Sequence, residues 1–223
     1  MLTRQPAPQR EERDWFAFAA GLVHSLCSDY IAVRMLYRLE PLTTAFTVVP
    51  KMIDVVEKSL KLHVAVQTQT PTALAAARSE YGHNVEKLRV KCATYDPTFD
   101  DADIRLFTKD LNDPDGKLYQ HLRYGAQETT RGFATNLAHL MPVVDKVFFK
   151  SLLLLPEGSR KQLVFTSSLK NLLTRSRFDQ SRYPAQLQEL LEADNPYIAE
   201  FLTYCHRIDA EHAALVAAAR PRS

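Results

Sequence analysis

The chain has 223 residues, of which 46% are hydrophobic, so it can form one domain with a sizeable core, or one domain and a small appendage. Only 6 residues are glycine, about 3% against a usual level of about 7%, which disfavours β-rich folds and glycine-rich phosphate loops. The formal net charge of +2 gives no overall basic field that would require nucleic acid as a partner.

The first third of the chain predicts long helices. Residues 1–12 are polar and lack the apolar core of a signal peptide, so we expect them to be disordered. Apolar residues then recur every three or four positions along two stretches, which predicts helices at about 13–39 and 44–68. Pro50 falls early in the second helix, where it marks either the first turn or a kink.

Shorter helices are expected along the rest of the chain, separated by turns rich in proline, glycine, aspartate and asparagine. Asn84 or His83 is expected to cap the helix that follows Gly82. Asn195 is expected to cap the last helix, with Pro196 at its first position. The expected helices are at 72–80, 83–95, around Ile104 to Leu111, and at 130–155, 158–175, 183–193 and 195–218. Because alternating strand patterns are almost absent, we predict an all-α fold.

Several common kinds of site lack their motifs. The sequence contains no glycine-rich nucleotide loop, no G-x-S-x-G, no C-x-x-C and no H-E-x-x-H, so we expect neither a cofactor nor a metal. The three cysteines are odd in number and far apart, which fits a reduced, cytoplasmic protein better than a disulfide framework. Lys150 and Pro156 interrupt the longest apolar stretches, so we expect no membrane span.

Three short motifs occur in order along the chain. The first is a Glu-Lys-x-x-Lys pattern late in the second predicted helix, the second a Gly-His pair that opens a later helix, and the third an Arg-Tyr pair further on. Their residues are Glu57, Lys58, Lys61, Gly82, His83, Arg123 and Tyr124. This order resembles the HEPN domain, an antiparallel helical bundle.

The resemblance implies a HEPN-like bundle over 13–156, with a helical C-terminal extension over 157–223 that packs on it. It also implies a non-catalytic role, either in binding a nucleotide or RNA or in binding a partner protein, in a bacterial defence or toxin–antitoxin setting. A homodimer that pairs through the first two helices is expected. A purely structural partner subunit is an alternative. The binding residues that the resemblance implies are Lys58, Lys61, His83, Arg123 and Tyr124.

The same residues also have a purely structural interpretation. Glu57 and Lys61 are four residues apart, which favours a stabilising ion pair on an exposed helix face. His83 follows a glycine at a helix start, where its ring can bond free backbone groups.

A metal-independent ribonuclease is a further alternative. Active HEPN proteins often cut RNA with an Arg-x4–6-His motif that is paired across a dimer. Histidine supplies an acid or base near neutral pH, and arginine stabilises the developing phosphorane charge. Arg78 to His83 and Arg207 to His212 both have this spacing. The second pair lies nearer the place that the resemblance implies, so Arg207 and His212 are the candidate catalytic residues.

A basic stretch at 158–182 carries six cations against one acid and is followed by an acidic stretch at 183–212. The cations can contact phosphates, or they can pair with the acids that follow. Arg175, Arg177 and Arg182 are therefore candidate binding residues.

Overall fold

The computed structural model describes residues 10–39, 45–68, 81–111, 137–165, 167–174 and 185–219. Within these ranges the chain forms nine α-helices and one short 3₁₀-helix, and no strand. The all-α class predicted from the spacing of apolar residues is therefore confirmed.

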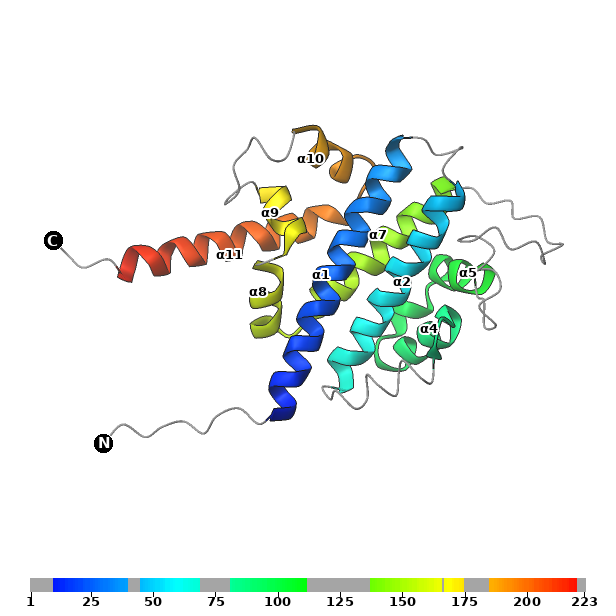
Figure 1. Ribbon diagram of the computed structural model, residues 1–223, viewed down its shortest axis with the longest axis horizontal. Helices are drawn as coiled ribbons and strands as arrows, with labels where there is room; N and C mark the ends of the chain where they lie inside the picture. Colours follow the sequence, from blue (N-terminus) through cyan, green and yellow to red (C-terminus); the bar gives the residue numbers. More distant parts are fainter. Residues whose placement is uncertain are drawn as a thin grey trace.

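The helices follow one another along the chain as Figure 1 shows. Their bounds are α1 Arg10–Leu39, α2 Ala45–Thr68, α4 Val85–Tyr95, η1 Pro97–Asp100, α5 Ala102–Asp110, α7 Leu137–Leu153, α8 Glu157–Phe165, α9 Ser168–Thr174, α10 Ala185–Glu192 and α11 Ile198–Ala219.

Three long helices form the centre of the molecule. α2 packs against both α1 and α7, and α1 also contacts α7, which runs behind them (Figure 1). The apolar stripe of α1 is buried there through Val23, Leu26, Tyr30 and Val33. Pro50 lies in the second turn of α2, so it does not mark the first turn of that helix.

The segment from α4 to α5 covers α2 and α7, and both of its α-helix starts are capped, that of α4 by one of the two residues predicted. The Asn84 side chain accepts the N–H of Lys87 at 2.8 Å, which makes it the cap of α4. The Asp101 side chain accepts the N–H of Asp103 at 3.0 Å at the start of α5. Each cap satisfies a backbone donor that the helix leaves without a partner.

Two predictions about the C-terminal third are wrong. The single helix expected at 158–175 is two helices, because the Ser167 hydroxyl accepts the N–H of Lys170 at 3.2 Å and caps a new helix, α9. Asn195 is not a cap. Its side chain turns inward and donates to the Tyr30 hydroxyl at 2.8 Å, and α11 begins only at Ile198.

Helix α1 also differs from the expectation that no stretch is long and apolar enough for a membrane. By length and composition its residues Phe16–Arg38 meet that criterion. A helix in the core of a protein meets the same criterion, and α1 packs on α2, α7, α8, α9 and α10.

Candidate functional site

The structure places side by side three candidate binding residues that come from two separate motifs. Lys58 and Lys61 lie on α2, and His83 lies just before α4. The network of ion pairs that holds them has two halves: Lys61 and His83 pair with Glu57, and Lys58 pairs with Asp29. The predicted binding residues Arg123, Tyr124, Arg175, Arg177 and Arg182 lie outside the described residues.

Glu57 is the centre of one half of this network. Its Oε2 is 2.9 Å from His83 Nδ1, and its Oε1 accepts from Lys61 Nζ at 2.5 Å. A carboxylate only accepts hydrogen bonds, so His83 Nδ1 is the donor. The Glu57–Lys61 pair was predicted, but on an exposed face, whereas Glu57 is buried. His83 therefore bonds the Glu57 carboxylate, a partner that the sequence did not predict.

Asp29 of α1 is the centre of the other half. Lys58 Nζ binds the Asp29 carboxylate and donates to Ser25 Oγ at 2.8 Å. Lys51 Nζ is 3.2 Å from Asp29 Oδ1 and 3.6 Å from Asp54 Oδ2. Burial alone would raise the pKa of Asp29, but the hydrogen bonds and charges of Lys58 and Lys51 outweigh burial and lower it.

We call these residues the lysine cluster: Lys51, Lys58, Lys61 and His83, with the carboxylates Asp29, Asp54 and Glu57. Asp29 and Ser25 were not predicted from the sequence. The signal in the sequence is that polar residues, His24, Ser25, Ser28 and Asp29, interrupt the apolar composition of α1. This pattern does not indicate which of them binds a lysine.

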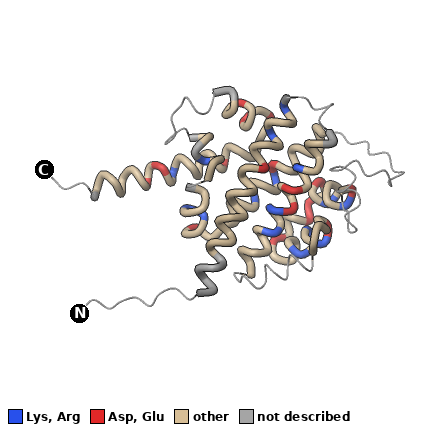
Figure 2. The backbone as a smooth tube through the Cα atoms, viewed as in Figure 1, with Lys and Arg blue, Asp and Glu red and all other residues tan. Residues whose placement is uncertain are grey.

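Within each ion pair of the cluster, the cation is more exposed than the carboxylate it pairs with. His83 is 56% exposed over Glu57 at 9%, and Lys51 is 36% exposed over Asp54 at 11%. The Lys58–Asp29, Lys51–Asp29 and Lys61–Glu57 pairs have the same order. Figure 2 shows the blue and red residues side by side along α2. A ligand that approaches this surface therefore meets cations first.

One cavity of the protein lies apart from the lysine cluster. This cavity of about 470 Å³ opens between α5, α7 and the start of α11, with Phe107, Val143 and Tyr197 in its wall. None of the cavity-lining residues belongs to the cluster. Among the residues that the structure describes, no group of three or more His, Cys, Asp or Glu is placed to hold a metal ion.

A second polar network, which the sequence analysis did not predict, is buried in the core. The Tyr30 hydroxyl donates to Asp145 Oδ1 at 2.7 Å and accepts from Asn195. Arg34 donates to the carbonyls of Leu191 and Ala193 at 2.9 and 2.8 Å, and lies 3.5 Å from Asp145 Oδ2. Burial raises the pKa of Asp145 to about 6, although the Arg34 charge and the Tyr30 hydrogen bond act to lower it. This network joins α1 to α7 and to the α10–α11 connection.

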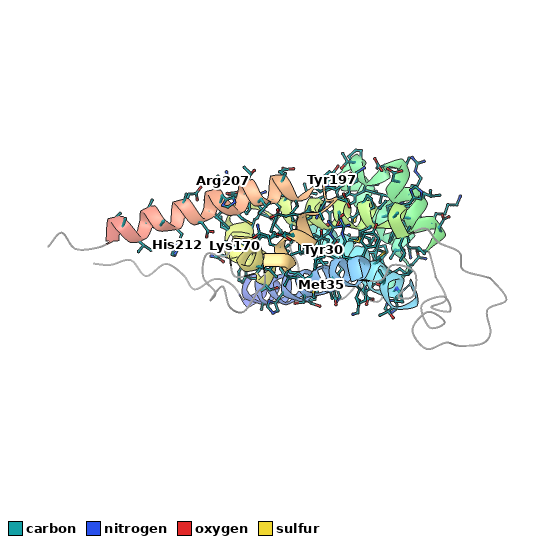
Figure 3. All side chains as sticks on the ribbon, turned by 90° about the horizontal axis from the view of Figure 1, so that it is seen from above. Tyr30, Met35, Lys170, Tyr197, Arg207 and His212 are labelled. Carbon is teal, nitrogen blue, oxygen red and sulfur yellow. The ribbon has the colours of Figure 1, made fainter. Side chains whose placement is uncertain are left out.

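The candidate catalytic residues Arg207 and His212 do not meet within the chain. Five helical residues correspond to a rotation of about 140°, and Figure 3 shows the two side chains on opposite sides of α11. Arg207 instead pairs with Glu157 at 3.0 Å and lies over the Tyr204 ring.

The described part of the basic stretch is paired with acids, as one of the two interpretations predicted. Lys161 lies 2.7 Å from Glu211, and the fully buried Lys170 binds Asp209. Both acids belong to the acidic stretch on α11. These lysines hold the C-terminal helices together.

No protein-family model, curated protein or solved structure matches the chain. The HEPN-like arrangement of the helices therefore stays a prediction from three short motifs.

Proposed function

We propose that the protein is a non-catalytic binding protein that holds a phosphate-bearing ligand, a nucleotide or RNA, against the lysine cluster. The observation that carries this proposal is that each cation of the cluster is more exposed than the carboxylate it pairs with.

The paired carboxylates position the cations for a ligand. An ammonium group has three N–H donors, so pairing with one carboxylate leaves donors that can reach a phosphate oxygen. Because the ion pairs already order Lys58 and Lys61, less side-chain entropy is lost when a ligand binds.

The lysines are also spread along the helix in a way that suits a ligand with several phosphates. Lys51 to Lys61 spans ten residues of α2, about 15 Å at 1.5 Å per residue. The carboxylates offset much of the positive charge, so we expect moderate affinity that falls with added salt.

The test is a titration of labelled single-stranded RNA, and separately of ATP, into the purified protein over a range of salt concentrations. Replacing both Lys58 and Lys61 with alanine should weaken binding about tenfold or more and reduce the salt slope by about 1.4, since each lost contact to a single strand contributes about 0.7. The control is Lys161→Ala, which also removes a lysine from an ion pair, but on α8, where its partner Glu211 is exposed. Equal losses in the control and the double variant would contradict the proposal.

One observation favours a second candidate function, a metal-independent ribonuclease. The Glu57 carboxylate orients the His83 imidazole, and this exposed ring can act as an acid or base beside the lysines. Total RNA incubated with the protein in EDTA tests this. Cleavage that His83→Ala abolishes would assign the activity to the lysine cluster, whereas cleavage lost in His212→Ala and Arg207→Ala would assign it to α11. RNA that is neither cut nor retained at low salt would leave the structural subunit as the remaining interpretation.

A further inference from the structure

The cavity between α5, α7 and the start of α11 has a largely apolar wall. Its volume of about 470 Å³ lies within the range of about 300–1,000 Å³ that is usual for small-molecule sites. The wall contains the buried Phe107 and Val143, the exposed Leu106, and the half-buried Tyr197, which lies just before α11 (Figure 3). The part of a ligand that lies against these side chains should therefore be apolar.

Two acids in the same wall, Asp103 and Asp110, are exposed, and an exposed carboxylate is negatively charged at pH 7. Neither carboxylate forms an ion pair or hydrogen bond with another residue that the structure describes. The bases in the wall are Lys146 and His139. Asp101 binds Lys146 at 2.7 Å and offsets its charge, so even a protonated His139 would leave one negative charge in excess. The cavity therefore favours a cation.

The two acids are spaced along α5 so that one ligand can reach both. Seven residues separate Asp103 from Asp110, which corresponds to about 10.5 Å along the helix axis and a rotation only about 20° short of two turns. The carboxylates therefore lie on one face of α5, with Leu106 and Phe107 between them. Along the cavity the order of groups is acid, apolar, acid.

We propose that this cavity binds an elongated organic dication, an alkyl chain with an ammonium group at each end. The two ends pair with Asp103 and Asp110, and the chain lies on Leu106 and Phe107. Each bond of an extended alkyl chain advances about 1.25 Å, so a chain of eight methylene groups holds its nitrogens about 11 Å apart, which matches the spacing of the acids. The inference is independent of the proposed binding of RNA, because no residue of the cavity belongs to the lysine cluster.

The expected affinity is modest. A ligand of ten non-hydrogen atoms at an ordinary ligand efficiency has a Kd of about 0.1–1 mM. Each exposed ion pair should change this Kd about two- to fivefold, and each methylene group that leaves water should change it about fourfold. The length of the chain should therefore matter more than either charge alone.

The test is isothermal titration calorimetry of 1,8-diaminooctane into the purified full chain at pH 7 and low salt. 1-Aminooctane has the same chain but one charge, so it should bind about two- to fivefold more weakly. 1,4-Diaminobutane has both charges, but it cannot reach both acids and has half the methylene groups, so it should bind at least about tenfold more weakly. Octanedioate, the same length of chain with a carboxylate at each end, should not bind.

Variants then locate the site. In Asp103→Asn, and equally in Asp110→Asn, the diamine should lose its advantage over the monoamine, because only one acid is left for it. The matched control is Glu189→Gln, which neutralises an exposed acid on α10 outside the cavity and should bind both amines as the wild type does. Thermal melting should show that all three variants keep the fold. Equal affinity for the two octyl amines in the wild type, a diamine advantage that survives both asparagine variants, or no binding of any amine would overturn the proposal.

Discussion

Asp145 and His63, which are both buried, should make opposite contributions to the pH dependence of stability. In the wild type these two contributions should cancel. Burial raises the pKa of Asp145 to about 6 from 3.8, and burial lowers the pKa of His63 to about 4 from 6.5. Each shift is slightly over two pKa units, which corresponds to about 3 kcal/mol at 1.36 kcal/mol per unit.

The environment explains why burial dominates at Asp145. Its Oδ1 accepts from Tyr30, but its Oδ2 has no hydrogen-bond partner in the described structure and lies 3.5 Å from Arg34. Arg34 directs its hydrogen bonds to two backbone carbonyls instead. The carboxylate therefore loses most of its hydration and gains one long ion pair in return.

The sign follows from which state binds more protons. Between about pH 4 and 6 the folded protein holds the Asp145 proton and the unfolded chain does not. The contribution of Asp145 to the free energy of unfolding is therefore full below about pH 4 and is lost as pH rises through about 6. His63 has the reverse effect. Its contribution is present above about pH 6.5 and is lost as pH falls through 4, because only the unfolded chain binds that proton.

The assay is urea unfolding followed by circular dichroism at several pH values from 4 to 7. The wild type should change little, since the two contributions cancel. His63→Leu removes two buried ring nitrogens without hydrogen-bond partners and should leave a protein that loses about 3 kcal/mol as pH rises. Asp145→Asn should gain about 3 kcal/mol over the same range. If His63→Leu keeps the flat profile of the wild type, the reasoning about both groups is wrong.

Two further predictions concern hydrogen bonds that fasten the C-terminal third. Tyr30→Phe removes the hydroxyl between Asp145 and Asn195 and should lower the free energy of unfolding by about 1–3 kcal/mol. The measurement is urea unfolding at pH 7, and a change within its error would mean that the network does not stabilise the fold. Ser167→Ala removes the cap of α9 and should lower the free energy of unfolding by about 1 kcal/mol. Ser167→Thr keeps a hydroxyl and should lower it much less. Similar losses in both variants would argue against capping.

The sequence predicted the presence and class of the helices better than their ends. Steps of three and four residues identify a buried helix face, because burial requires that periodicity. The sequence at the break between α8 and α9 has no proline or glycine. A serine within a polar run, such as Ser167, is equally compatible with the interior of a helix. Only the fold shows that its hydroxyl serves as a cap.

The candidate site was partly predictable for a related reason. Lys58, Lys61 and His83 were identified from local patterns, but their partner Asp29 comes from α1, 29 residues before Lys58. The buried network is less predictable still. Asp145 is conspicuous as a charge within the apolar run of α7, yet its partner Tyr30 is 115 residues away. Such pairings depend on how the helices rotate against each other, which periodicity alone does not specify.

The rotation of α1 links the buried network to the lysine cluster. Asp29 and Tyr30 are neighbours in the sequence, so they point about 100° apart around the helix. Tyr30 faces Asp145 in the core, and Asp29 faces Lys51 and Lys58 at the surface. A turn of α1 that broke the Tyr30 hydrogen bond would also move Asp29 away from the two lysines. The buried network therefore holds α1 at the rotation that the surface cluster requires, although no residue of the network reaches that surface.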